Sequence, residues 1–264
     1  MATDPSLDGN GGLPLEALKR ADALLALRNG PASRADLMET LGVSRTTVHR
    51  LVRALEAEDI IAQDGNEFRL TAFGRTVTDE VSTYRRRVSA ASRIQPFLET
   101  VEDPPAQIGL FADATVTETA PTDPYAPVAR FMELLRGSNT LRGFDTTSIA
   151  PVFVPEIRDE ILNGMDTNVI YLPSVVESIV ENHSEDVADA IDRGSLTLST
   201  HSDLPFGLAI FDDRIGLGGY DEDTGILKVF VDTDDEQARE WALEQFEAYH
   251  EEARAIDEAG FVDA

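Results

Sequence analysis

The chain has 264 residues, and 42% of them are hydrophobic, which is enough apolar material for domains with real cores and excludes full disorder. It contains no cysteine, so disulfides, thiolate metal sites and cysteine nucleophiles are excluded. Its formal net charge of -27 comes from 49 acidic and 22 basic residues, and Lys19 and Lys228 are the only lysines. A surface rich in carboxylates and poor in lysine is typical of proteins from salt-saturated cytoplasm, so we expect the source to be an extreme halophile.

The negative charge is concentrated in the carboxy-terminal part of the chain. Residues 11–101 contain 13 basic and 12 acidic side chains, whereas residues 102–264 contain 9 basic and 35 acidic ones. The amino-terminal third is therefore nearly neutral inside a strongly acidic protein, which is what a domain with an acidic partner requires. A small domain that samples charge differently by chance is the alternative.

The amino terminus carries no signal for a membrane. No apolar run approaches the roughly 18 residues that a membrane span needs, and residues 1–12 are polar and glycine-rich rather than signal-like. We therefore expect a cytoplasmic protein without membrane contact, with disordered tails at residues 1–12 and 258–264.

Residues 13–71 predict a small helical domain that ends in a hairpin. Leucine and alanine at helical spacing predict a first helix over residues 15–28, which an Asn-Gly-Pro sequence ends. Ser33 and Asp36 have the spacing of a capping box and predict the start of a second helix. Gly42 suits the tight turn that closes this helix, because glycine adopts positive φ without strain.

Ser44 is the predicted N-cap of a third helix. The apolar side chains of this helix fall within a narrow arc that includes Val48, Val52 and Leu55, and its opposite face is polar and cationic. Two short helices joined by a glycine turn, with arginine and threonine outward on the second, are typical of the helix-turn-helix motif. Arginine can pair with guanine, and threonine can contact thymine methyl groups or phosphates. The candidate DNA contacts on this helix are Ser44, Arg45, Thr46, Thr47, His49, Arg50 and Arg53, although each arginine alone is also compatible with a solvated helix face.

Residues 60–71, IIAQDGNEFRLT, predict a β-hairpin because apolar and polar residues alternate around an Asp-Gly turn. This hairpin would be the wing, and Arg69 on its returning strand is a candidate phosphate contact. The order of elements and the following run LTAFGRTV resemble the winged-helix transcription regulators. The resemblance covers residues 13–100 and implies binding to double-stranded DNA.

Residues 72–101 predict a linker and dimerisation helix, which runs from Thr71 to about Gln95. Its apolar residues step by four, three, four and three, the spacing of a coiled-coil seam that would join two subunits, and they are Val77, Val81, Tyr84, Val88 and Ala91. The alternative is that the helix packs on its own domain. Pro96 is expected to end or kink the helix, and the acidic run EDPPAQ at 102–107 predicts an interdomain linker.

Residues 104–257 alternate helical and strand patterns, and we expect Ser174 and Thr233 to cap two of the helices. The pattern predicts a three-layer α/β domain with a mixed sheet. The fold class is therefore an α+β winged helix-turn-helix domain followed by an α/β domain. The stretches APTDPYAPVARFMELLRG and LPFGLAIFDDRIGLGGYDEDTG resemble the carboxy-terminal domain of archaeal winged-helix regulators of the TrmB-like and methanogenesis-regulator kind. The resemblance implies a sensor domain with a phospholipase-D-like fold.

The catalytic pattern of the phospholipase-D-like fold is absent from the sequence. It requires a lysine two residues after a histidine, and the residues at that offset are instead Leu51, Glu185, Asp203 and Glu252. We therefore expect no enzymatic activity, no cofactor and no metal site. A degenerate phosphodiesterase remains as a remote alternative.

A small effector is the expected ligand of the carboxy-terminal domain. In open α/β sheets ligands bind beyond the carboxyl ends of the strands. The polar residues that follow predicted strands are the candidate effector site: Asp145, Thr146, Ser174, Thr200 and His201. Each has a structural alternative as a helix cap or loop residue.

These observations predict a sequence-specific transcription regulator, dimeric and from a halophilic archaeon. A winged helix used for protein contacts is the alternative, but its outward face would be more apolar. At about 1 M salt the Debye length is only ~3 Å, so repulsion between the acidic domain and DNA is screened. Phosphate attraction is weakened as well, so we expect recognition to depend on base edges and groove shape.

Overall fold

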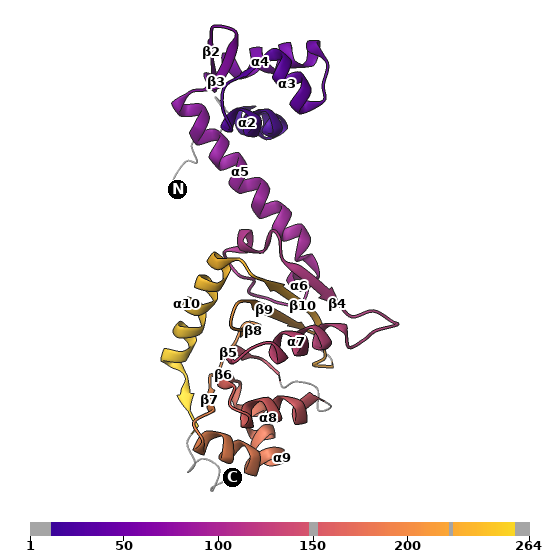
Figure 1. The fold of residues 1–264 in the computed structure, drawn as a ribbon, viewed down its shortest axis with the longest axis vertical. Coiled ribbons are helices and arrows are strands. Elements are labelled where there is room, and N and C mark those ends of the chain that lie inside the picture. The colour runs from indigo at the N-terminus through magenta and orange to yellow at the C-terminus, as the bar shows by residue number, and fades with distance from the viewer. Residues whose placement is uncertain (1–11, 148–152, 222–223, 257–264) are drawn as a thin grey trace, which may run out of the picture. The chain divides into compact units, whose positions relative to one another are not determined.

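The computed structural model describes residues 12–147, 153–221 and 224–256, and the chain divides into two compact units. The division falls between Val88 and Ser89, inside a long helix (Figure 1). Within the described ranges no helix is both long and apolar enough to cross a membrane.

The first unit contains short helices and a three-stranded sheet of strand order β1-β3-β2. The hairpin between β2 and β3 turns at Gly65, whose φ of 60° requires glycine or a strained residue. In chain order the elements are α1 (Gly12–Lys19), α2 (Ala21–Arg28), β1 (Ala32–Ser33), α3 (Arg34–Leu41), α4 (Arg45–Ala57), β2 (Ile61–Asp64), β3 (Glu67–Leu70) and most of α5 (Ala72–Arg93).

The start and stop signals of the second helix are confirmed. The Ser33 side chain accepts a hydrogen bond from the Asp36 N–H, and the Asp36 carboxylate accepts one from the Ser33 N–H. Gly42 ends this helix in the left-handed conformation, with φ 63°. The single helix predicted over residues 15–28 is wrong, because the backbone leaves helical geometry at Arg20 (φ -110°, ψ 16°) and two helices result.

The core of the first unit also holds the start of α5. Leu24, Leu37 and Phe68 are fully buried there, and Val81 of α5 is 5% exposed in the same cluster. Val77 is partly buried against it. The first half of the predicted coiled-coil seam therefore packs within its own domain.

The second half of the predicted seam remains at the surface. Tyr84 is 53% exposed and Val88 is 46% exposed, whereas Ala91 is half-buried. The spacing of apolar residues shows which face of the helix is apolar, but not what that face packs against. It therefore cannot predict that one half of the seam is buried and the other exposed.

The second unit is built on an eight-stranded mixed sheet of order β11-β7-β6-β5-β8-β9-β10-β4. β5, β6 and β7 are parallel, and the other neighbouring pairs are antiparallel. Its elements are α6 (Gln95–Leu98), a 3-10 turn (Ile108–Phe111), β4 (Thr115–Glu118), α7 (Ala126–Arg136), β5 (Thr140–Asp145), α8 (Val154–Leu162), β6 (Asp166–Tyr171), α9 (Pro173–Asp192), β7 (Leu196–Thr200), β8 (Gly207–Ile210), β9 (Ile215–Tyr220), β10 (Leu227–Thr233), α10 (Glu236–Glu252) and β11 (Arg254–Ala255).

Helices cover both faces of this sheet (Figure 1). On one face Phe144 and Ile170 pack in a core with Trp241 and Phe246 of α10. On the other face α7, α8 and α9 pack in two further apolar clusters. The three layers confirm the predicted α/β domain with a mixed sheet, and with the winged unit they confirm the predicted fold class.

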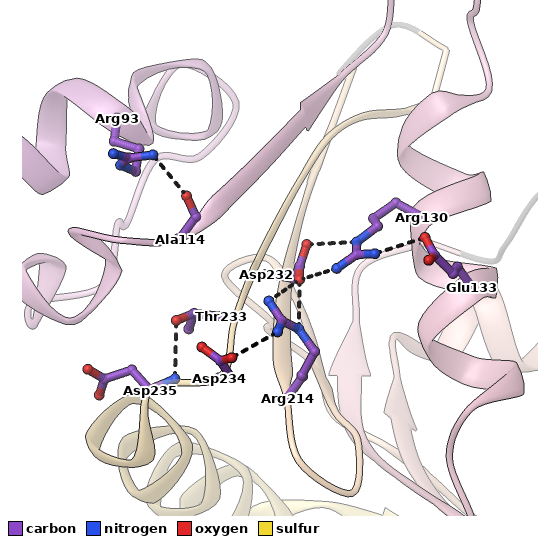
Figure 2. Close-up of polar contacts among 9 residues, drawn as sticks. All are labelled: Arg93, Ala114, Arg130, Glu133, Arg214, Asp232, Thr233, Asp234 and Asp235. Atoms are coloured by element: carbon purple, nitrogen blue, oxygen red, sulfur yellow. Dashed lines mark hydrogen bonds and ion pairs between the residues drawn. The ribbon is translucent and has the colours of Figure 1, made fainter.

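A network of ion pairs around a buried carboxylate joins β10, the neighbour of edge strand β4, to α7 (Figure 2). Asp232 of β10 is fully buried and accepts hydrogen bonds from Arg130 (Nη2, 2.8 Å) and Arg214 (Nε, 2.9 Å). Arg214 reaches onward to Asp234 at 3.2 Å. Hydrogen bonding to Asp232 is the main cause that raises the pKa of Arg130, so this guanidinium stays charged.

The segment predicted to link the domains belongs partly to the second core. Ile94 and Phe97 are fully buried among residues of the second unit, and Pro105 is buried as well. The boundary therefore lies earlier than residues 102–107. Pro96 stands at the start of α6, after α5 has ended, which confirms its predicted effect on the helix.

Two predicted helix caps are wrong. α9 begins at Pro173 after Leu172, so Ser174 is its second residue and makes no cap hydrogen bond. α10 is capped by Asp235, which accepts from the Ala238 N–H, and Thr233 lies two residues too early. At α9 the N-cap position is held by Leu172, followed by a proline in the first turn, and at α10 it is held by Asp235.

Candidate functional site

α4 presents one face to its core and the other to solvent. The Ser44 side chain caps it, accepting a hydrogen bond from the Thr47 N–H at 3.3 Å. Val48, Val52 and Leu55 are at most 2% exposed, which fixes the rotation of the helix. The opposite face is consequently exposed, and with Arg69 on the hairpin all the candidate DNA contacts are exposed: Ser44, Arg45, Thr46, Thr47, His49, Arg50, Arg53 and Arg69.

The arginines of this exposed face have no carboxylate partner. Within the described parts of the chain, Arg45, Arg50 and Arg53 make neither an ion pair nor a side-chain hydrogen bond, although residues 11–101 contain 12 acidic side chains. A planar guanidinium with five free donors suits bidentate pairing with a base edge or a phosphate. The face therefore has the donors that a polyanionic partner needs.

Arg69 lies on the returning strand of the hairpin, where the wing is expected to meet a phosphate. Its Nε is 3.9 Å from the Asp64 carboxylate, and both side chains are more than half exposed. An exposed ion pair of this length contributes about 0–1 kcal/mol, so Arg69 can exchange Asp64 for another anion at little cost.

Arg34, which sequence analysis did not select, connects the wing to the helix-turn-helix motif. It is the first residue of α3, and its guanidinium carbon lies 4.7 Å from the centre of the Phe68 ring in β3. Its Nε is buried and lacks a hydrogen-bond partner among the described residues. The two residues are 34 positions apart in the sequence, so no local sequence pattern predicts this contact.

The candidate effector residues lie at one edge of the second unit's sheet but on different faces. The parallel register aligns Asp145 with Tyr171 and Tyr171 with Thr200, so these three side chains share a face. His201 lies on the opposite side, where its ring meets that of Tyr249 at 5.2 Å. Ser174 is exposed on α9. The predicted convergence of all five residues is therefore wrong, because side chains alternate along a strand.

His201 is occupied by contacts within its own domain. Its Nδ1 accepts a hydrogen bond from the Asp203 N–H at 3.1 Å, and its Nε2 lies 3.8 Å from the Glu252 carboxylate. These contacts fit the structural alternative stated for this histidine.

Asp145 has the most unusual environment of the candidate residues. Its carboxylate accepts hydrogen bonds from the Tyr220 hydroxyl (2.5 Å) and the Thr146 N–H (2.7 Å). Burial nevertheless raises its pKa to about 7, because loss of hydration destabilises the charged carboxylate more than these hydrogen bonds stabilise it. Burial, and secondarily the Asp145 charge, raise the pKa values of Tyr171 and Tyr220. Both tyrosines are therefore neutral hydrogen-bond donors near neutral pH.

A cavity of about 180 Å³ lies between α8, α9 and the three parallel strands. Tyr171 contributes to its wall, so it adjoins the edge where Asp145 lies. Most of the wall is aliphatic, from Leu141, Ile157, Ile161, Val169, Ile179, Val187, Ala190, Leu196 and Leu198. The sequence shows that these positions are apolar but not that they leave a void.

The described residues offer no cluster for a metal. Across residues 12–147, 153–221 and 224–256, no three histidine or acidic side chains gather as metal ligands would.

Two families match the sequence, one in each unit. Residues 124–252 match the family described as the methanogenesis regulatory protein FilR1, middle domain. Residues 13–93 match the family described as the HVO_A0261 N-terminal domain. The curated proteins include no match to the sequence.

Several solved structures are similar over much of the chain. One is described as TrmBL2, an archaeal chromatin protein with a novel mode of DNA binding; it is 16% identical, covers 95% of this chain and 97% of its own, and has a TM-score of 0.45. A phospholipase D family member, Nuc from Salmonella typhimurium, is 13% identical and covers 55% of this chain and 99% of its own, with a TM-score of 0.42. NucT from Helicobacter pylori is 12% identical with the same coverage and a TM-score of 0.41.

Proposed function

We propose that this chain is a DNA-binding transcription regulator of the TrmB-like archaeal kind. The match of residues 124–252 to the FilR1 middle domain and that of residues 13–93 to the HVO_A0261 N-terminal domain support this proposal. In this proposal it reads a specific operator as a homodimer in the cytoplasm of a halophilic archaeon. Its second unit senses a small effector and catalyses no reaction.

One observation carries the DNA-binding proposal. Arg45, Arg50 and Arg53 are exposed on one face of α4 without a carboxylate partner among the described residues. Residues 11–101 contain 12 acidic side chains, and other exposed arginines of this unit, Arg28 and Arg85, do pair with carboxylates. Exposed Thr46 and His49 keep this face polar, which disfavours its use as an apolar protein-binding surface.

The wing and α3 extend the proposed interface. Arg69 would contact a phosphate beside the major groove, while α4 reads base edges within it. The stacking of Arg34 on Phe68 holds the wing against α3, so both contacts are presented by one rigid domain.

Arg50→Ala is expected to weaken binding to the preferred duplex by about 1–3 kcal/mol, roughly fivefold to 150-fold, because a bidentate base contact is lost. The measurement is fluorescence anisotropy with duplexes selected from genomic fragments, at low and molar potassium chloride. Arg193→Ala is the matched control, since Arg193 is an exposed arginine of the second unit paired with Asp189. Equal binding by both variants, or no duplex binding by the wild type at any salt concentration, would refute the proposal and favour a protein partner.

We also propose that the exposed part of α5 joins two subunits. Tyr84 and Val88 are large apolar side chains, one helical turn apart and about half exposed. Burial of both against a second copy would place two α4 helices on one duplex, as palindromic operators require.

Tyr84→Glu is expected to convert a dimer to a monomer, because a carboxylate would have to be buried in an apolar contact. Sedimentation equilibrium in molar salt measures the mass directly. Glu80→Gln, an exposed position on the same helix, serves as the control and should remain dimeric. A wild-type protein that is monomeric at micromolar concentration would disprove this part of the proposal.

A further inference from the structure

We propose that the cavity between α8, α9 and the parallel strands binds a small, uncharged, mostly apolar molecule that carries one hydrogen-bond acceptor. A role for this ligand in regulation rests on the function proposed above, whereas binding of the ligand to the cavity does not. Three features favour such a ligand: the size of the cavity, its largely aliphatic wall and the hydroxyl group of Tyr171.

The size of the cavity limits the ligand. A volume of about 180 Å³ is close to that of engineered apolar cavities of about 150 Å³, which take up benzene. This cavity opens to solvent, so an apolar guest would displace water from a largely aliphatic wall, which is favourable. A guest of about six to ten non-hydrogen atoms therefore fits this volume.

The kink in α9 explains why packing leaves space here. His183 has non-helical backbone angles (φ -142°, ψ 27°), and its side chain lines the cavity. Ile179 before the kink and Val187 after it line the same space. A helix that changes direction over the sheet cannot fill the groove with one continuous ridge. A bound molecule would contact both halves of α9.

The hydroxyl group of Tyr171 supplies the polar contact. Tyr171 lines the cavity, and its hydroxyl makes no hydrogen bond to another residue in the described ranges. By contrast, the nearby Tyr220 hydroxyl is occupied by Asp145. This hydroxyl is not one of the fully buried polar atoms that lack a partner, so water can reach it in the free protein. An acceptor on the ligand would replace that water and hold the ligand in one orientation.

Charge next to the cavity favours a neutral ligand. Asp145 is close enough to raise the pKa of Tyr171, and an anionic ligand at this hydroxyl would meet the same carboxylate. The cavity-lining Arg158 is paired with Asp159 and Asp186, at 2.9 and 3.4 Å, so its charge is already compensated. Arg158 and Asp186 are about 40% exposed, which places them where the cavity meets solvent.

Three probes of similar shape test the inference on the full chain without DNA: toluene, acetophenone and benzoate. Chemical-shift perturbation of methyl signals gives the affinities, and the shifts are expected at Val187 and Leu198. Acetophenone should bind threefold to tenfold more tightly than toluene, as one hydrogen bond allows. Benzoate should bind at least tenfold more weakly than acetophenone, because its charge would be desolvated beside Asp145.

Two variants assign the binding to this cavity. Tyr171→Phe should reduce the affinity for acetophenone to that for toluene, whereas Tyr249→Phe, a half-buried tyrosine on the opposite face, should leave it unchanged. Ala190→Leu fills the cavity and should abolish binding of both probes; if that variant does not fold, the volume-conserving Tyr171→Phe still decides the question.

The inference is overturned if toluene produces no shifts up to its solubility limit, or if benzoate binds as tightly as acetophenone. Unchanged acetophenone affinity in Tyr171→Phe would overturn the assigned hydroxyl contact. These measurements contain no DNA, so their failure leaves the proposed DNA-binding function standing, and a failure of the Arg50→Ala test leaves this cavity site standing.

Discussion

Asp232→Ala is expected to lower the free energy of unfolding of the second unit by about 3 kcal/mol or more, because two arginines would lose the buried carboxylate that they share. Asp232 is fully buried, and the side chains of Arg130 and Arg214 are only 23% and 22% exposed (Figure 2). Partial exposure lets the arginines recover some hydration, so the lower end of the usual range of about 3–5 kcal/mol applies. Fluorescence of Trp241, which is buried in the core of the same unit, reports this unfolding.

Asp234→Ala is the control for this prediction. Asp234 also pairs with Arg214, but its side chain is 76% exposed, so its removal should cost at most about 1 kcal/mol. Equal destabilisation by the two variants would show that the buried position of Asp232 is not what matters.

Gly74→Ala is expected to destabilise the first unit by about 1–3 kcal/mol, although alanine normally stabilises a helix by about 1 kcal/mol relative to glycine. A Cβ atom on Gly74 would lie 1.8 Å from the Ile60 carbonyl oxygen, which already accepts a hydrogen bond from the Thr71 N–H. The clash is with backbone, so α5 would have to move away from the strand region that it packs against. Amide hydrogen exchange of α4 and β3 measures the loss of stability.

Gly137→Ala provides the comparison for this substitution. Gly137 follows α7 with φ -87°, and the nearest atom to an added Cβ is 3.6 Å away, an ordinary contact. This variant should change stability by less than about 0.5 kcal/mol. A stabilising effect of Gly74→Ala would contradict the close approach of α5 to Ile60.

Local chemistry made the first unit predictable from its sequence. The capping box at Ser33 and Asp36, the left-handed Gly42 and the cap at Ser44 each depend on atoms within four residues, and the structure contains all three. The rotation of α4 follows from the spacing of its apolar residues alone. One prediction for this unit failed at Arg20, where one expected helix is two.

The strand patterns of the second unit also predicted its mixed sheet, but not its ends. β4 (Thr115–Glu118) and β11 (Arg254–Ala255) are short edge strands with little buried surface. Their own residues show no clear strand pattern, and they are strands because they pair with β10 and β7. Side-chain alternation placed Asp145 and Thr200 on one face and His201 on the other, which separated residues that their position after a strand had grouped. Nor does a sequence reveal a void, since the same aliphatic residues can fill a core or surround a cavity.

The position of the unit boundary inside α5 determines where the chain can be divided. A fragment that ends in the proline-rich segment at residues 102–107 would carry Ile94 and Phe97 away from the core in which they are fully buried. The remaining part would then expose the apolar surface that these two side chains cover, and aggregation would follow. A cut between Val88 and Ser89 interrupts a helix instead, but leaves the apolar core of each unit whole.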